Sequence, residues 1–226
     1  MDTSDRAAPA DRAALSDRAA LTDRAALTDR ARRLAAGGGR RILGIAGAPG
    51  AGKSTLAARI VEELQERAVL VPMDGFHLAG AELERLGRAD RKGAPDTFDA
   101  AGYTALLRRL RHPGGPDPVY APAFDRALEE PVAGSVCVPA DIPLVVTEGN
   151  YLLLDEGPWA PVRGLLDEAW FLDADPGLRV RRLVDRHVRF GKPRPYAERW
   201  VAGSDEHNAR LAERHRDRAD LVVRLS

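Results

Sequence analysis

The sequence predicts an α/β fold, a three-layer sandwich in which helices cover both faces of a five-stranded parallel sheet. Five short apolar runs can each form a buried strand. Helical or irregular stretches separate these runs, which implies crossover connections and parallel strands. The first run leads through a glycine-rich loop directly into a helical stretch. The five runs are residues 41–46, 68–73, 142–147, 168–172 and 220–225.

Length and composition favour one domain with additions. The chain has 226 residues, and a typical domain has roughly 150. Lys+Arg and Asp+Glu both number 34, so the net charge is zero and no global field attracts nucleic acid or an anionic membrane. The apolar runs are too short to span a bilayer, and we expect no secretory signal because the first 36 residues are rich in Asp and Arg. The lone Cys137 excludes an internal disulfide. We therefore expect a cytoplasmic protein with no nucleic-acid or membrane partner.

A six-residue repeat occupies most of residues 1–36. Its copies begin with Asp-Arg and continue mainly with Ala-Ala-Leu. On a helix each copy advances by 600°, so Leu15, Leu21 and Leu27 cannot form one apolar stripe. We interpret residues 1–36 as a partly helical, weakly docked extension, with a partner-binding helix as the alternative. Three glycines at 37–39 end the segment, and the folded domain is expected over 37–226.

The loop after the first strand has the pattern GxxxxGK[ST] in the strand–loop–helix setting that this pattern requires. Gly47 and Gly52 let backbone N–H groups approach phosphate oxygens, where a Cβ would clash. Lys53 is the mobile cation for the outer phosphates, and the Ser54 hydroxyl is a ligand for Mg²⁺. The helix expected over 56–67 presents its N-terminus to the same anion. The sequence thus predicts a site for ATP and Mg²⁺, formed by Gly47, Ala48, Pro49, Gly50, Ala51, Gly52, Lys53, Ser54 and Thr55.

A carboxylate comes immediately after the second predicted strand, and another comes immediately after the third. Ligands of open parallel sheets bind at the carboxyl edge of the strands, so Asp74 and Glu148 are expected to face the triphosphate. We assign Asp74 as the general base and Glu148 to the metal, with a helix N-cap as the alternative for each. Their neighbours Phe76, His77 and Asn150 are assigned to the substrate. An Asn-Lys-x-Asp pattern for guanine is absent, which favours phosphoryl transfer to a bound acceptor over GTP hydrolysis.

About seventy residues separate Asp74 from the third strand, more than a simple crossover needs. They include an amphipathic run over 100–111. Basic side chains of this insertion can bind an anionic or a hydroxyl-rich acceptor, and aromatic ones can form the wall of its pocket. Simple packing and surface ion pairs are the alternatives. The acceptor residues expected here are Arg91, Lys92, Tyr120 and Arg126, with Phe124 beside them.

Arginines dominate the helical stretch between Pro176 and Gly191. Taking 100° per residue, four of them fall within an arc of about 80°. A local excess of cations in a neutral protein points to the triphosphate and to a lid that closes over it. A solvated basic face is the alternative. We assign Arg186 and Arg189 to catalysis and Arg182 to the nucleotide, while Arg179 completes the row.

Taken together, these motifs resemble the phosphoribulokinase/uridine kinase superfamily over roughly residues 32–226. Within it the chain is similar to bacterial kinase-like proteins that also resemble pantothenate kinase and a kinase of fructose-transport operons. The resemblance implies a P-loop fold, ATP–Mg²⁺ as donor, Asp74 as base and an arginine-bearing lid. Pantothenate kinases have a His at the place of Pro122, and uridine kinases have one between the counterparts of Tyr120 and Arg126. Neither is present, so neither substrate carries over.

The sequence therefore predicts an ATP-dependent kinase that phosphorylates a hydroxyl of a small molecule that is nucleoside-, pantothenate- or sugar-like. A nucleotide-dependent ATPase or switch acting on a protein partner is the competing hypothesis. The physiological acceptor stays open, and so does a homodimer.

Overall fold

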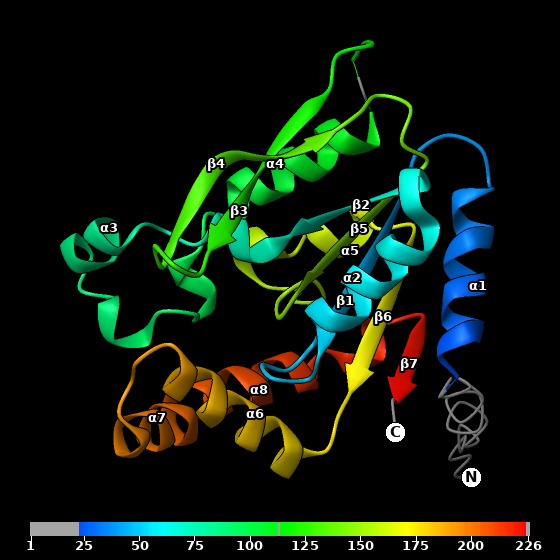
Figure 1. Ribbon diagram of the computed structural model, residues 1–226. Coiled ribbons are helices and arrows are strands. Elements are labelled where there is room, and N and C mark those ends of the chain that lie inside the picture. The colour runs from blue at the N-terminus through cyan, green and yellow to red at the C-terminus, as the bar shows by residue number, and fades with distance from the viewer. Residues whose placement is uncertain (1–22, 113, 225–226) are drawn as a thin grey trace, which may run out of the picture.

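The chain was analysed as a computed structural model, which describes residues 23–112 and 114–224. The predicted sheet is confirmed: five strands, all parallel, lie in the order β2-β5-β1-β6-β7. Both faces of the sheet are covered by helices (Figure 1). This is why the strands are nearly continuous apolar runs without alternation. The strands are β1 (Arg41–Gly47), β2 (Ala68–Pro72), β5 (Leu144–Gly149), β6 (Glu168–Asp173) and β7 (Leu221–Arg224).

Two separate apolar cores lie against the two faces of the sheet. Successive side chains of a strand point to opposite faces. On β1, Leu43 and Ile45 belong to one core, and Ile42 and Ala46 to the other. The first core includes residues of α1 and α2, and the second includes residues of α4 and α5. These helices are α1 (Arg24–Ala35), α2 (Lys53–Leu64), α4 (Ala100–Arg111) and α5 (Val162–Leu165).

The remaining helices surround the carboxyl edge of the sheet. Short 3-10 turns join several of them, and among the described residues no helix has both the length and the apolar character that crossing a membrane requires. In Figure 1, α6 to α8 form a layer below this edge, and α3 lies on the insertion to its left. The helices are α3 (Gly80–Arg85), α6 (Pro176–Arg189), α7 (Arg194–Trp200), a π-helical turn at Val201–Asp205 and α8 (Glu206–Arg214).

The insertion contains a β-hairpin that the sequence analysis does not predict. Strands β3 (Val119–Asp125) and β4 (Glu130–Val138) pair antiparallel. Pro122 lies inside β3, where proline argues against a regular strand. The pairing register shifts between Ala121 and Ala123, so the proline is accommodated at this irregularity. The hairpin extends the fold beside the edge of the sheet where the phosphate loop lies (Figure 1).

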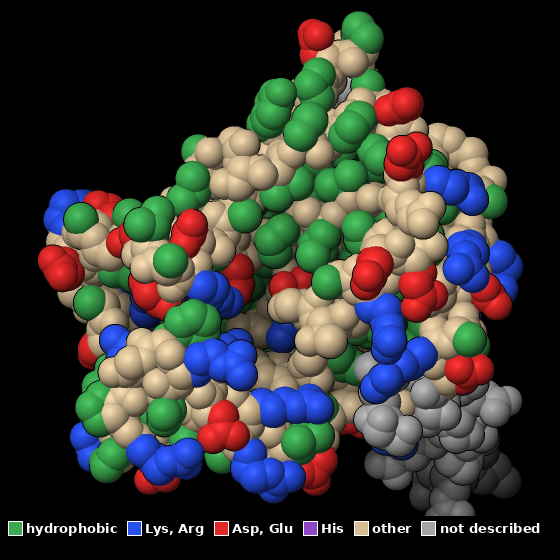
Figure 2. Space-filling model, in the orientation of Figure 1, with side chains coloured by type: hydrophobic (Ala, Val, Ile, Leu, Met, Phe, Trp, Pro, Cys, Tyr) green, Lys and Arg blue, Asp and Glu red, His purple; other side chains and the backbone are tan. Residues whose placement is uncertain are grey.

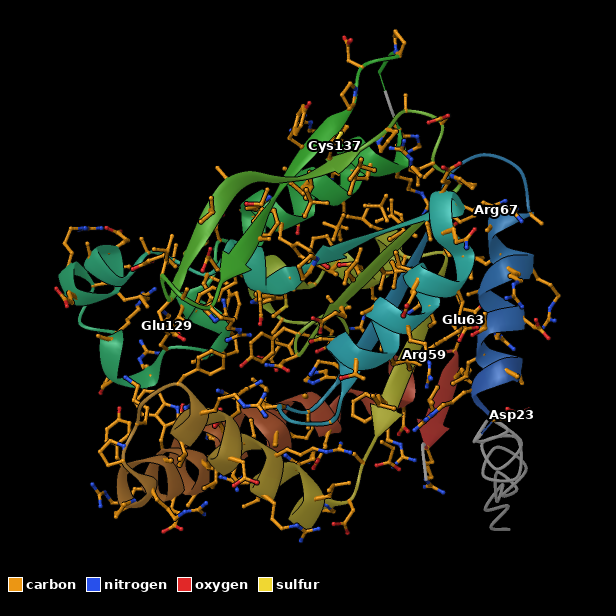
Figure 3. All side chains as sticks on the ribbon, viewed as in Figure 1. Asp23, Arg59, Glu63, Arg67, Glu129 and Cys137 are labelled. Atoms are coloured by element: carbon orange, nitrogen blue, oxygen red, sulfur yellow. The ribbon has the colours of Figure 1, made fainter. Side chains whose placement is uncertain are left out.

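Helix α1 corrects the expectation of a weakly docked extension. Leu27 and Ala31 are fully buried, and Ala35 nearly so. Their spacing of four residues places them on one side of the helix, against the core that α2 shares. Figure 3 shows Asp23 at the start of α1 and Glu63 of α2 facing this helix. Residues 24–35 are therefore part of the folded core, while the earlier copies of the repeat lie outside the described residues.

We predict that Leu27→Ala lowers the free energy of unfolding by about 2–5 kcal/mol, because it leaves a cavity in a closed core. Urea unfolding followed by circular dichroism measures this change. Leu128→Ala is the matched control, since Leu128 is 65% exposed and its truncation should change stability little. Equal effects of the two substitutions would contradict the docking of α1.

Candidate active site

The phosphate loop connects β1 to α2, and its shape depends on glycine. Gly50 and Gly52 have φ angles of 76° and 99°, in the left-handed region that disfavours other residues. A Cβ on Gly50 would lie 2.8 Å from the backbone oxygen of Arg179, so the loop also packs tightly under α6. Gly52 is the N-cap of α2 and offers no capping side chain. The first N–H groups of this helix therefore remain for an anion.

Lys53 is buried at the start of α2. Its Nζ donates to the backbone oxygen of Ala48 at 3.0 Å and to Oδ1 of Asn150 at 2.8 Å. Burial lowers the pKa of Lys53 to about 8, while the charges of Glu148 and Asp74 oppose this shift. A buried ammonium group with a lowered pKa indicates that its full counter-charge arrives with a ligand. The negative charge of a polyphosphate in this loop would stabilise the ammonium form of Lys53.

We predict that ATP binding at pH 8.5 takes up most of one proton. Lys53, whose pKa is about 8, is largely neutral there in the free protein, and a bound polyphosphate raises its pKa again. Titration calorimetry in two buffers of different ionisation enthalpy measures the uptake. Lys53→Arg keeps a charge that does not titrate, so its binding should show no uptake near this pH. Uptake that persists in Lys53→Arg would contradict the assignment to Lys53.

The Ser54 hydroxyl and the Glu148 carboxylate lie beside Lys53, and their oxygens can bind a hard cation. Ser54 Oγ donates to Oε1 of Glu148 at 2.8 Å, and Glu148, the last residue but one of β5, has only 5% of its surface exposed. Burial raises the pKa of Glu148, and repulsion by Asp74 raises it further, while Lys53 acts in the opposite direction. Oxygen ligands of this kind are those that Mg²⁺ prefers. Ser54 and Glu148 therefore fit a Mg²⁺ site.

Asp74 lies just beyond β2, in a short helical turn over Met73–Phe76. Its Oδ2 accepts a hydrogen bond from Nη2 of Arg126 at 2.9 Å. The Arg126 guanidinium is in turn 4.8 Å from the centre of the Phe124 ring. A Cβ on Gly75 would overlap the backbone oxygen of Pro122, so the turn that carries Asp74 packs directly on the hairpin. Glycine at 75 thus fixes Asp74 between the sheet and the insertion.

His77 is held as a neutral ring beside Asp74. Its Nδ1 donates to the backbone oxygen of Asp74 at 2.9 Å, and its ring packs against Phe98 and Phe124 at centroid distances of 4.0 and 5.0 Å. Burial lowers the pKa of His77, although the Asp74 charge acts against this shift. A neutral ring that donates from Nδ1 has Nε2 free to accept a hydrogen bond.

Two adjoining cavities meet at Asp74. The phosphate cavity, of about 270 Å³, is lined by the loop with Lys53, Ser54 and Glu148. The outer cavity, of about 350 Å³, lies between the insertion and the helices α6 to α8. Figure 2 shows the hollow on this face of the molecule, with a basic side chain inside it. The two cavities share four lining residues: Asp74, Arg126, Asn150 and Arg186.

A third space, the side cavity, has a volume of about 360 Å³ and adjoins the start of α2. Thr55 and Arg182 line both the side cavity and the phosphate cavity. Arg24 of α1 lines it as well, although the sequence analysis places residue 24 outside the folded domain. The phosphate loop therefore opens onto two further spaces, the outer cavity and the side cavity.

The arginines of α6 divide by position. Arg186 lines both the phosphate and the outer cavity, and Arg182 lines the phosphate and side cavities. Arg179 is buried: it donates to the backbone oxygen of Pro49 at 3.2 Å and pairs with Glu206 of α8 at 3.1 Å. Arg189 is exposed at the end of the helix and lines none of the three cavities. The predicted row of arginines thus separates into cavity and structural positions.

Of the acceptor residues expected on the insertion, Lys92 and Arg126 line the outer cavity, together with Phe124. Arg91 instead pairs with Asp96 at 2.6 Å, and Tyr120 is 57% exposed on β3. Phe76 packs against Tyr103, at a centroid distance of 5.2 Å, and lines neither the phosphate nor the outer cavity. The structure therefore brings together some of the predicted acceptor residues and separates others.

Apart from Arg186, the residues that α6 to α8 and their connections contribute to the outer cavity were not predicted from the sequence. Tyr196 and Trp200, one turn apart on α7, line it with their rings stacked at 5.9 Å. An aromatic pair four residues apart was the available signal, but on a helix such spacing more often marks packing. The other unpredicted lining residues from this region are His187, Phe190, Lys192, Asp205 and Asn208.

A glycine-rich phosphate loop at the carboxyl edge of a parallel sheet, with carboxylates after the neighbouring strands, defines a nucleotide-binding phosphotransferase of the P-loop class. The model of the phosphoribulokinase/uridine kinase family matches residues 42–194. The chain belongs to this family, as the resemblance of its motifs predicts.

Similar proteins and a similar solved structure support this membership. The chain is 35% identical over 161 residues to a candidate uridine kinase of Schizosaccharomyces pombe, covering 67% of this chain and 68% of that protein. It is 32% identical over 192 residues to the uncharacterized YggC of Escherichia coli, covering 83% and 78%. The crystal structure of a candidate fructose transport system kinase from Silicibacter has a TM-score of 0.80 and 36% identity, covering 89% of this chain and 99% of that one.

Proposed function

We propose that the protein is an ATP-dependent kinase that transfers the γ-phosphoryl group to a hydroxyl of a small molecule. The position of Asp74, which lines both the phosphate cavity and the outer cavity, carries this proposal. Asp74 accepts the proton that the acceptor hydroxyl loses as its oxygen attacks the γ-phosphorus. The bond from this phosphorus to the bridging oxygen breaks, and ADP leaves.

The other residues of the phosphate cavity position the triphosphate and compensate its negative charge. Lys53 and Arg186 compensate the charge on the transferred group, and Ser54 and Glu148 hold Mg²⁺. Bound Mg²⁺ supplies further charge compensation on the phosphate oxygens. The side cavity, with Arg182 and Arg24, offers room for the base and sugar of the nucleotide. Positioning and electrostatics therefore provide most of the rate acceleration.

Nucleoside-, pantothenate- and sugar-like acceptors all suit the outer cavity, whose volume of about 350 Å³ lies in the range of small-molecule sites. This room beyond Asp74 favours a kinase over an ATPase or switch that acts on a protein partner. The family also supports a kinase, because its named members transfer phosphoryl groups to small molecules.

The test is release of ADP from Mg²⁺-ATP by the full chain, with and without a panel of nucleosides, pantothenate, sugars, sugar phosphates and polyols. One or more acceptors should raise the rate well above the acceptor-free rate, and the phosphorylated product should be visible by mass spectrometry. A rate that is the same with every acceptor, but increases with a protein partner, would instead favour the switch.

A further inference from the structure

Lysine is rare in this chain and gathers at one place. There are 3 lysines and 31 arginines in 226 residues. Lys53 lines the phosphate cavity, and Lys92 and Lys192 line the outer cavity. Arginine thus provides the surface ion pairs, while each of the three lysines lines the phosphate cavity or the outer cavity. A lysine ammonium is a compact charge with three donors, suited to a small anionic group that can be approached from several directions.

Lys92 is held in place without a carboxylate partner. It follows a short helical turn at Ala89–Arg91, and its Nζ donates to the backbone oxygen of Glu129 at 2.8 Å. Figure 3 shows Glu129 at the turn of the hairpin. The same Nζ lies 5.1 Å from the centre of the Phe124 ring. A carbonyl and a ring orient this ammonium group but leave its charge uncompensated.

Lys192 reaches the same cavity from the other wall, in the turn between α6 and α7. Its Nζ lies 5.9 Å from the centre of the Tyr196 ring. Within residues 23–112 and 114–224, no carboxylate forms an ion pair with Lys192 or with Lys92. The two lysines therefore come from different elements and both present unpaired charge to one cavity.

Among the described residues, none of the acids that line the outer cavity forms an ion pair with Lys92 or Lys192. Asp74 forms an ion pair with Arg126 at 2.9 Å, and Oδ2 of Asp205 lies within hydrogen-bond distance, 3.2 Å, of Nε2 of His187. Glu129 also lines the cavity, and it meets Lys92 through its backbone oxygen. Over its whole lining the outer cavity carries the cations Lys92, Arg126, Arg186 and Lys192 against the acids Asp74, Glu129 and Asp205, an excess of one positive charge.

We propose that the acceptor carries an anionic group, a carboxylate or a phosphate, which Lys92 and Lys192 bind while its hydroxyl lies at Asp74. This inference rests on the proposed kinase function and specifies its substrate class. Four aromatic rings line the same cavity and would pack against the carbon skeleton of the acceptor. They belong to Phe98, Phe124, Tyr196 and Trp200. An anionic group would pair with both ammonium groups, whereas an uncharged acceptor offers them no counter-charge.

Matched acceptor pairs test this proposal in the ADP-release assay. Pantothenate against its alcohol pantothenol and glycerate against glycerol test a carboxylate, while ribulose 5-phosphate against ribulose tests a phosphate. The charged member of at least one pair should have a kcat/KM at least about tenfold above that of its neutral partner. A neutral member that is phosphorylated as efficiently as its charged partner would overturn the anionic class and leave the kinase function standing.

Lys92→Gln and Lys192→Gln locate the anion. Each should raise KM for the charged acceptor about tenfold or more, with a smaller change in kcat and a smaller change in KM for the neutral partner. Arg109→Gln is the matched control, because Arg109 is exposed on α4 and lines none of the cavities. An unchanged KM in both lysine variants would overturn the proposed site.

A measurement without turnover separates this inference from the kinase function. The full chain, saturated with Mg²⁺-ADP, is acetylated briefly with acetic anhydride, and each lysine is followed by mass spectrometry. Inorganic phosphate or pantothenate should slow the acetylation of Lys92 and Lys192, whereas sodium chloride of equal ionic strength and pantothenol should not. Equal acetylation in all samples would overturn the anion site. Protection without any acceptor-dependent ADP release would instead uphold the anion site and reject the kinase.

Discussion

Asp74→Asn is expected to lower kcat for acceptor phosphorylation by about 10²–10⁴-fold, the usual loss when a general base is removed. An amide has the shape of the carboxylate and its oxygen can still accept the hydrogen bond of Arg126, so the site should stay folded. It cannot take up the proton of the acceptor hydroxyl. The loss should therefore fall on kcat, while binding of ATP changes little.

Steady-state kinetics of ADP release, with calorimetric measurement of ATP binding, distinguish this outcome from a general defect. Asp117→Asn is the matched control, because Asp117 is exposed and lines none of the cavities. If Asp74→Asn retains turnover within a few-fold of the unaltered protein, Asp74 is not the base.

The second large effect is expected for Lys53→Met. Methionine keeps the length and apolar stem of the side chain but removes the ammonium group that the phosphate loop surrounds. We expect kcat/KM for ATP to fall by about 10²–10³-fold or more, as happens when a preorganised donor to a developing charge is lost. Burial penalises the charged form of Lys53, so the variant should not lose stability in proportion to its loss of activity.

Thermal unfolding measured beside the kinetics tests both halves of this expectation. A folded but inactive Lys53→Met protein supports the role of Lys53 at the phosphates. Turnover within a few-fold of the original would contradict it, and so would an activity loss that only follows unfolding.

Much of the sheet could be predicted because strands buried on both faces are continuous apolar runs in the sequence. The hairpin could not, because Pro122 interrupts β3 and much of β4 is exposed. The docking of α1 was missed for a different reason. The hexad repeat draws attention to its leucines, whereas the buried stripe consists of Leu27 and the small residues Ala31 and Ala35.

At the candidate active site, too, some residues could be placed from the sequence and others could not. Asp74 and Glu148 could be placed because the ends of parallel strands meet at one edge, so adjacency in space follows from topology alone. Whether Arg186 or Arg189 reaches the phosphate cavity depends on where α6 ends relative to the phosphate loop. A helical projection of the sequence does not contain this information. Long-range packing likewise decides that Lys92 lines the outer cavity while its neighbour Arg91 pairs with Asp96.

Arg179 connects the phosphate loop to the helix that borders the outer cavity. One guanidinium holds the Pro49 oxygen of the phosphate loop and Glu206 of α8, and Asp205 and Asn208 on either side of Glu206 line the outer cavity. A single buried side chain thus joins the part of the site proposed for the nucleotide to the part proposed for the acceptor. The factor by which bound nucleotide changes acceptor affinity must equal the factor by which acceptor changes nucleotide affinity. Substrate synergy, if measured from one side, therefore fixes the value on the other.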